Sequence, residues 1–434
     1  MGLRATLQCS NNRTNVRLST YRGTKAAIAH QAIARGLKVP KITLPFSSRL
    51  ALRQLRYKGG NLIGVFSGVC VAIILVFVQI GYEQAVVNSV LNFDRALRAD
   101  LVVTGPQFQV IGYAPPWFNR GVLFRTEGVP GVSETRPVYI SVMQVRSHIN
   151  DEPLTARFTC FDPARPVLDL PEVDRQLPLL SLPGTILIDR ESRQGLSMFA
   201  SSVEAGGMRP LYLQNAAADT APRVDVRGAY SLGPDFTIFG NFLTSDLTFY
   251  RIFRQPLDRV SLGLITLRPG FDLEAVKADV AHEVGNDAKI FTRAEFLKQE
   301  HDFFIFRTPV GIVFMSGIGI GVVIGIVFVL NMLHGIIDSN LSEYAVLRAM
   351  GYRDRFFRSL VLQIATLITS VALIPSLLIT ALIYAALRRS TQLPFVLTWP
   401  QGLTVFGASV VMGMAAALLA IRKLRTSNPL ELFS

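Results

Sequence analysis

Acidic side chains are missing from the start of the chain, where the first one is Glu83. Residues 1–58 instead contain twelve Lys or Arg residues. They lack the apolar stretch of a secretory signal, which excludes that kind of leader. Residues 1–45 are rich in Arg, Ser, Thr and Asn. This composition predicts a disordered basic tail in the cytoplasm; a transit peptide or a start site placed too early would also account for it.

Charge is also missing from four long apolar runs, although 17% of all residues are charged. An apolar helix of about 20 residues crosses the hydrocarbon core of a bilayer, so each run predicts a membrane span. A polar transport path normally places ionisable residues inside the spans, and their absence argues against a pump or secondary transporter of that type. The four predicted spans are Leu62–Ile80, Val310–Leu333, Leu360–Leu387 and Leu403–Ile421.

Motifs for catalysis are missing too. Nothing in the chain matches the GxxxxGK[ST] loop that holds nucleotide phosphates or the GxSxG nucleophile turn. His282-Glu283 lacks the second histidine of an HExxH zinc helix, and His301-Asp302 is typical of a surface pair. We therefore expect this chain not to be an enzyme and to have no catalytic residue, metal site or cofactor of its own. If ATP is used, another chain binds it.

The distribution of positive charge predicts the orientation. The basic excess lies directly before the first span, whereas Gln84–Thr308 is nearly neutral, with 23 basic and 26 acidic residues. Because cytoplasmic segments carry the excess of Lys and Arg, both termini are predicted in the cytoplasm and the long segment outside it. Arg388 and Arg389, in a short outer loop, are exceptions. Topology and anionic headgroups account for the net charge of +13, so no nucleic-acid partner is expected.

The expected fold is a membrane protein with four transmembrane α-helices in a 1+3 arrangement. A large mixed α+β extracytoplasmic domain is inserted between helices 1 and 2. Arg49, Arg53 and Arg56 share one helical face and predict an interfacial helix, or else a simple stop signal. The three cysteines fall in different compartments and predict no disulfide. The predicted parts are a tail (1–45), an interfacial helix with the first span (46–82), the outer domain (83–308), and three spans with a cytoplasmic coupling loop at 334–358 (309–434).

The outer domain is predicted from short β-like runs separated by Pro and Gly. Helices are predicted over Gln84–Arg98, Asp272–Gly285 and Arg293–Phe306, with Gly285 as a C-cap. In Tyr113–Gly121, aromatic residues beside prolines suit either a partner contact or a packed loop. The predicted strands are Leu101–Thr104, Val138–Val145, Thr155–Phe161, Thr185–Ile188, Val224–Tyr230 and Ser261–Leu267.

The second span carries a ridge of small residues. Gly317, Gly321 and Gly325 recur at every fourth position. This spacing lets helix backbones approach closely in a membrane. The ridge predicts close packing, either within the chain or at the seam of a dimer.

A charged segment, Ser342–Phe357, separates the second and third spans and holds five charges in sixteen residues. Ile337, Leu341 and Tyr344 are spaced to form one apolar stripe on a helix. The pattern predicts a short helix across the cytoplasmic face that docks another protein. A solvated connector, the alternative, would not need such a stripe.

The end of this short helix is also predicted. Arg348 lies in its last turn, where a cation favours the helix C-terminus. Gly351 is placed to end the helix in the left-handed conformation. Asp354 is placed as the N-cap of the third span, and Glu343, Arg348 and Arg353 are predicted to face the cytoplasm.

Two segments resemble a known family. The stretch EYAVLRAMGYRDRFFRSLVLQ is similar to the signature of FtsX-like, MacB-type ABC transporter permeases. The ending AIRKLRTSNPLELF resembles the closing motif of that family, with Pro429, Leu430 and Leu432. The one-plus-three plan with a large outer domain matches as well. The resemblance covers Pro45–Phe433, and the wording EYAVL…GY is most similar to the DevC branch.

The resemblance implies a homodimer in the bacterial inner membrane, served by a separate LolD/MacB-like ATPase that binds the ATP. It also implies a mechanotransmitter, in which closure of the ATPase moves the outer domain. For the DevC branch, a periplasmic membrane-fusion adaptor and an outer-membrane channel would complete an efflux or export pump. FtsX-like control of cell-wall hydrolases and LolC-like lipoprotein release stay open as alternatives, and the sequence does not name a substrate. The implied coupling residues are Glu343, Tyr344, Leu347, Arg348, Gly351 and Tyr352.

Overall fold

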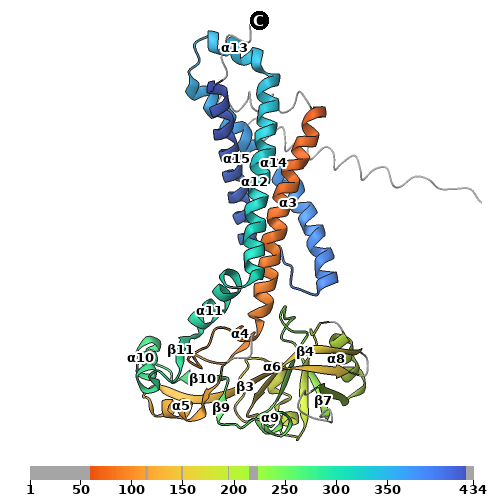
Figure 1. The fold of residues 1–434 in the computed structure, drawn as a ribbon, viewed down its shortest axis with the longest axis vertical. Coiled ribbons are helices and arrows are strands. Elements are labelled where there is room, and N and C mark those ends of the chain that lie inside the picture. Colours follow the sequence, from red (N-terminus) through yellow and green to blue (C-terminus); the bar gives the residue numbers. More distant parts are fainter. Residues whose placement is uncertain (1–58, 113–115, 148–149, 194, 215–222, 427–434) are drawn as a thin grey trace, which may run out of the picture. The chain divides into compact units, whose positions relative to one another are not determined.

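The computed structural model describes residues 59–112, 116–147, 150–193, 195–214 and 223–426 (Figure 1). Several predictions fall on residues outside these ranges. They concern the basic tail, the interfacial helix with its three arginines, part of the loop Tyr113–Gly121, and the closing motif at Pro429, Leu430 and Leu432.

Four long apolar helices confirm the predicted spans. They are α3 (Gly59–Val90), α12 (Pro309–Ser339), α14 (Asp354–Thr391) and α15 (Trp399–Thr426), and each is long and apolar enough to cross a membrane. Every helix is longer than the uncharged run that predicted it, because polar residues at the ends continue the helical turns. The ribbon in Figure 1 shows α12 running alongside α3.

A mixed α/β domain is inserted between α3 and α12, as predicted. Its largest sheet has nine strands in the order β11-β1-β10-β3-β4-β8-β5-β7-β6, and β2 pairs separately with β9. The strands are β1 (Leu101–Thr104), β2 (Phe118–Asn119), β3 (Val132–Ser147), β4 (Asn150–Phe161), β5 (Thr185–Asp189), β6 (Arg209–Gln214), β7 (Arg223–Tyr230), β8 (Gly240–Ser245), β9 (Arg259–Val260), β10 (Leu262–Leu267) and β11 (Lys289–Thr292).

Helices of the inserted domain lie between these strands in the chain. The last of them, α11, leads directly into α12. They are α4 (Asn92–Ala96), α5 (Arg120–Arg125), η1 (Thr126–Gly128), α6 (Pro171–Asp174), α7 (Leu177–Leu180), α8 (Gly195–Gly206), α9 (Asp246–Phe253), α10 (Leu273–Val284) and α11 (Arg293–Phe306).

The long strand β3 belongs to two parts of the sheet. Its first half pairs with β10 in a four-stranded part, β11-β1-β10-β3. Its second half pairs with β4 on one side and with β6 on the other. Because β4, β8, β5, β7 and β6 are paired in series, the β3–β6 pairing closes these six strands into a ring. Local hydrophobic pattern does not predict this closure, which joins strands far apart in the sequence.

The helices α10 and α11, on either side of β11 in the chain, begin with ordinary capping interactions. The Asp272 side chain accepts a hydrogen bond from the backbone N–H of Ala275 at 2.9 Å and starts α10. Thr292 and Glu295 form a capping box at the start of α11. The capping box fixes the start of α11, the helix that connects the sheet to α12.

The two elements that join the domain to the long helices are built into its core. Phe93 of α4 and Phe296 of α11 are 2% and 1% exposed and belong to one apolar cluster. The same cluster contains Val102, Leu243 and Leu264 of the sheet. A displacement of α3 or α12 therefore acts on packed core residues rather than on a free linker.

Candidate functional site

The charged segment between the second and third spans forms a corner of two short turns and one helix. The helix α12 ends at Ser339, and the Asn340 side chain donates to the carbonyl of Ile336 at 2.7 Å. The helix α13 (Leu341–Ala349) follows, and α14 begins at Asp354. We refer to residues 340–357 as the α13 corner. Because α12 has 31 residues, the corner lies about 46 Å along the helix from Pro309.

A Schellman motif ends α13. The backbone N–H of Tyr352 donates to the carbonyl of Leu347 at 3.2 Å, and that of Gly351 donates to the carbonyl of Arg348 at 3.1 Å. Gly351 has φ of +91°, a conformation that residues with a Cβ rarely adopt. Gly351 was predicted to end the helix with a positive φ, and it does so one residue after the C-cap Met350. Asp354 is not the N-cap of α14, because Arg353 occupies that position.

Aromatic side chains hold the corner together. Tyr344 is buried, and its ring meets the ring of Phe357 edge-on at 5.9 Å. Tyr352 and Phe356 lie 4.7 Å apart between ring centroids. The ion pair of Arg348 with Asp354, at 3.3 Å, is exposed on both sides and contributes little. Ring packing therefore sets the angle between α13 and α14.

The outward surface of the α13 corner differs from the predicted stripe. Ile337 lies in α12 and is buried, and Tyr344 points inward, so the two residues do not form a docking stripe. The apolar side chains that face outward are Val346 and Met350, which are 60% and 63% exposed. Tyr352 is 40% exposed. The spacing of Val346 and Met350 is the signal that could have found them.

Charged residues surround this apolar surface. Glu343, Arg348 and Arg353 are exposed, as predicted, while Leu347 is partly buried. Exposed apolar side chains with a charged rim are typical of protein interfaces. All six predicted coupling residues lie in the α13 corner, and the exposed residues Val346 and Met350 lie among them.

The glycine ridge on α12 faces other helices of the same chain. A Cβ added at Gly317 would lie 2.5 Å from Gln79 Cδ, and one at Gly321 would lie 2.9 Å from Val76 Cγ2. At Gly325 it would lie 1.9 Å from Met412 Sδ. The first two glycines therefore pack on α3 and the third on α15. The geometry favours the first of the two predicted uses, close packing inside the chain.

Replacing Gly321 with leucine is expected to destabilise the helical bundle. The stiff, β-branched Val76 cannot yield easily to the added side chain, so overpacking should cost about 2 kcal/mol. Gly319→Leu is the matched control, because nothing lies within 4 Å of a Cβ at that position. Thermal unfolding of both purified variants in detergent measures the difference. A lower melting temperature for Gly319→Leu alone would contradict this packing.

Hydrogen bonds between helices tie α14 to α3. The Tyr384 hydroxyl donates to the carbonyl of Phe77 at 2.5 Å, and Gln401 of α15 donates to the Tyr384 oxygen at 2.5 Å. Ser376 donates to the carbonyl of Cys70 at 3.2 Å. Gly81 leaves room for the Tyr384 hydroxyl, since a Cβ there would lie 2.0 Å from it. Sequence reasoning missed these contacts, because those between α14 and α3 join residues about 300 positions apart.

A group of buried charged residues joins α4 and α11 to the sheet. We refer to Asp94, Arg157, Asp235 and Glu300 as the root cluster; they are at most 4% exposed. Arg157 pairs with Asp235 and lies 5.0 Å from the Phe93 ring centre. Glu300 accepts from the backbone N–H of Ile111 at 2.8 Å. Neither oxygen of Asp94 has a hydrogen-bond partner among the described residues.

Burial makes two carboxyl groups of the root cluster weak acids. The pKa of Asp94 is raised to about 7, mainly by desolvation; Arg157 and Arg95 oppose the shift, whereas Asp235 adds to it. Desolvation also raises the pKa of Glu300 well above its usual range, and the neighbouring Asp94 adds to this shift. One arginine cannot neutralise three carboxylates, so protonation keeps the cluster close to neutral.

The histidines that the sequence singled out are not brought into a site. His301 Nδ1 lies 3.1 Å from Asp302 Oδ1 on a half-exposed surface. His282 lies in the last turn of α10. Within the ranges that the structure describes, no group of three His, Cys, Asp or Glu side chains could hold a metal ion.

The four apolar helices and the inserted domain define a multi-pass membrane protein. Residues 315–429 match the family model of the FtsX-like permease C-terminal domain. This C-terminal part of the chain is therefore similar to the corresponding domain of FtsX-like permeases. The predicted resemblance is confirmed at this level.

Two solved structures are similar to part of this chain. One is the periplasmic region of MacB from Actinobacillus actinomycetemcomitans, with 9% identity over 46% of this chain and 92% of that chain and a TM-score of 0.29. The other is the extracellular domain of the noncanonic ABC-type transporter YknZ from Gram-positive bacteria, with 12% identity over 44% of this chain and 99% of that chain and a TM-score of 0.30. A comparison with curated proteins finds no match.

Proposed function

We propose that this permease is a mechanotransmitter: a separate ABC ATPase docks on the α13 corner, and its movement is passed through the long helices to the outer domain. The observation that carries the proposal is the exposed pair Val346 and Met350 within a charged rim, on a helix fixed by a Schellman motif. A rigid helix end with an apolar centre suits transmission of force better than a solvated connector does.

The path from the corner to the outer domain has few flexible joints. The helix α12 runs without interruption from Ser339 to Pro309, and only Arg307 and Thr308 separate it from α11. The Thr308 hydroxyl donates to the carbonyl of Phe304 at 2.6 Å and accepts from the backbone N–H of Gly311 at 3.2 Å. Movement of α12 would therefore reach α11 and the root cluster.

The rest of the proposed assembly follows from this role. The chain works as a homodimer in the bacterial inner membrane, with both termini in the cytoplasm and ATP bound by the partner ATPase. A periplasmic membrane-fusion adaptor and an outer-membrane channel complete an efflux or export pump. The uncharged runs inside the four long helices carry no Asp, Glu, Lys or Arg, which supports transport by movement of the outer domain rather than through a polar path in the bilayer.

Disrupting the α13 corner is expected to uncouple the ATPase. Val346→Asp places a charge at the centre of the apolar surface and should weaken ATPase binding about tenfold or more. Glu343→Lys changes the rim and should have a smaller effect. Gly351→Val should abolish coupling, because a β-branched residue strongly disfavours φ of +91°. Co-purification of the ATPase and permease-stimulated ATP hydrolysis in lipid nanodiscs measure these effects.

Two controls accompany these variants. Asp279→Lys reverses a charge on an exposed position of the outer domain, and Gly335→Val adds the same side chain where nothing lies within 4 Å. Both controls should keep full stimulation. If the three corner variants also kept full stimulation at normal membrane levels, the corner would be a connector and the proposed function would be wrong.

A further inference from the structure

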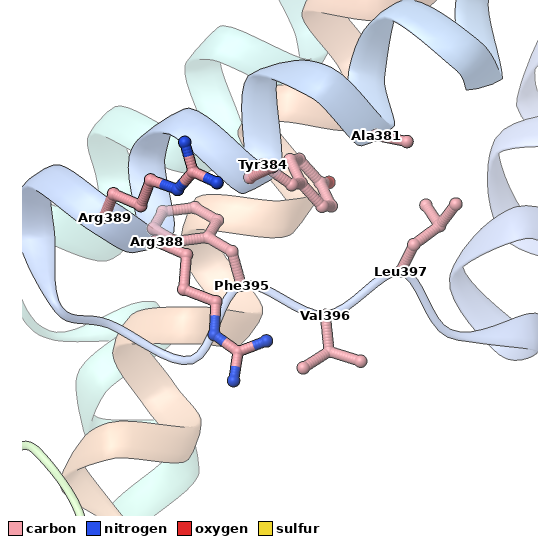
Figure 2. Close-up of a pocket in the computed structure, with 8 residues that line it drawn as sticks. Ala381, Tyr384, Arg388, Arg389, Phe395, Val396 and Leu397 are labelled. Atoms are coloured by element: carbon pink, nitrogen blue, oxygen red, sulfur yellow. The ribbon is translucent and has the colours of Figure 1, made fainter.

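A cavity of about 660 Å³ opens at the end of α14, on the side of the bundle where the chain turns into the segment before α15. One wall is α14, with Ala381, Tyr384 and Ala385, and the other is the connecting segment Phe395–Leu397. Its volume is in the usual range for small-molecule sites, about 300–1,000 Å³. Figure 2 shows the lining side chains, with Arg388 and Arg389 diverging from the helix end.

The lining of the cavity changes along α14. Ala381, Ala385 and Arg388 are separated by four and three residues, so they lie on one face of the helix. The two alanines leave a shallow apolar channel, bordered by the exposed Val396 and Leu397. The arginine lies at the helix end. Moving from Arg388 to Ala381 leads from the end of a span towards its middle, so the charged part is at the membrane boundary and the apolar part is within the bilayer.

The two arginines have no acidic partner. Among the described residues, no carboxylate oxygen lies within 4.0 Å of a nitrogen of Arg388 or Arg389. The C-terminal end of α14 favours positive charge in its last turn. This preference for positive charge does not explain why Arg388 lies at the end of an apolar channel. Trp399, 86% exposed two residues after Leu397, is typical of the boundary between membrane and water.

We propose that this cavity binds an anionic phospholipid of the surrounding leaflet. The phosphate lies at the guanidinium group of Arg388, where the channel ends, with the positive charge of Arg389 nearby, and one acyl chain lies along Ala385 and Ala381. Guanidinium groups match phosphate oxygens in charge and geometry. This inference requires the chain to span a membrane, but it does not depend on an ATPase or on transport. It also accounts for two basic residues that contradict the charge rule for the outer side.

Quenching of Trp399 by brominated lipids tests the proposal. The full chain is reconstituted in phosphatidylcholine vesicles with a tenth of the lipid as brominated phosphatidylglycerol or, separately, brominated phosphatidylcholine. An arginine near a headgroup favours the anionic lipid about fivefold, so two should give a preference of roughly 25-fold. In Arg388→Gln/Arg389→Gln the preference should fall close to one. Arg353→Gln/Arg355→Gln, which removes the same charge at the other end of α14, should keep it.

A second variant separates a lipid from other occupants. Ala385→Phe fills the apolar channel and keeps both arginines, so it should also lose the preference if an acyl chain occupies the channel. Protection of the wild type from heat by inorganic phosphate alone, unaffected by Ala385→Phe, would assign the site to a free anion. Equal quenching by the two lipids in the wild type would overturn the proposal. Exclusion of both lipids from Trp399 would do the same, because it would indicate a protein surface covering the cavity.

Discussion

Replacing Gly311 with alanine is expected to prevent the normal junction between α11 and α12. An added Cβ would lie 2.0 Å from the carbonyl oxygen of Ile305 and 2.5 Å from that of Phe304. Both are backbone atoms, so no side-chain rotation can relieve the clash. The junction must open, which should lower the free energy of unfolding by about 3 kcal/mol and change the direction in which α12 leaves the outer domain.

The control for this prediction lies on the same helix. Gly319→Ala makes the same chemical change where nothing lies within 4 Å of the added atom. Size-exclusion chromatography after detergent extraction and thermal unfolding compare the two variants with the wild type. Gly311→Ala should show less folded protein and a lower melting temperature, and Gly319→Ala should resemble the wild type. Equal melting temperatures for the two variants would contradict the tight junction.

Raising the pH is expected to destabilise the outer domain through the root cluster. The pKa of Asp94 is raised to about 7 in the folded protein by desolvation first and by Asp235 next. A raised pKa means that the folded state holds the proton more firmly than the unfolded state. Stability is therefore greatest below pH 4 as far as this group is concerned, and it falls as the pH rises to about 7. The loss is at most about 4 kcal/mol.

Asp94→Asn should remove the part of this dependence that Asp94 contributes, while Glu300 and Asp189, whose pKa values are also raised, keep theirs. The neutral amide resembles the protonated carboxyl group, so the variant should be more stable than the wild type at pH 8 and nearly equal to it at pH 4. Asp279→Asn, at an exposed position, should leave the dependence unchanged. Calorimetric melting of the full-length protein between pH 4 and 8 provides the measurement. If the melting temperature of Asp94→Asn fell with pH as steeply as that of the wild type, Asp94 would not contribute to the dependence.

Local sequence pattern was sufficient for elements with strong periodicity or clear caps. The strand Leu101–Thr104 and the helix Arg293–Phe306 have the predicted bounds. The Asp272–Gly285 prediction matches α10 with its N-cap and C-cap residues included. These elements form where propensity, capping and burial agree.

Other elements were missed because their signals depend on tertiary contacts. The strand β8 (Gly240–Ser245) is buried throughout, so it has no alternation of exposed and buried residues to read. The strand β3 starts at Val132, six residues earlier than predicted, and includes Pro137, which usually argues against a strand. Pairing of β3 with the distant strand β10 stabilises this first part of β3 despite its weak local pattern and its proline.

The candidate site was predicted in position but not in orientation. The charges and Gly351 were enough to place a short capped helix between the second and third spans. The predicted apolar stripe was wrong, because α12 continues to Ser339 and separates Ile337 from α13. The root cluster could not be predicted at all, since its four residues come from distant parts of the chain and meet only in the folded domain.

The ring of six strands in the outer domain limits how another protein can attach there. Every strand of the ring is paired on both sides for at least part of its length, so an incoming peptide has few free backbone groups to pair with. Strand addition and exchange of strands between neighbouring copies are correspondingly disfavoured. The outermost strand of the remaining sheet, β11, has only four residues. Any partner of this domain would therefore recognise side chains on the loops and helices, and such surfaces can change without altering the sheet.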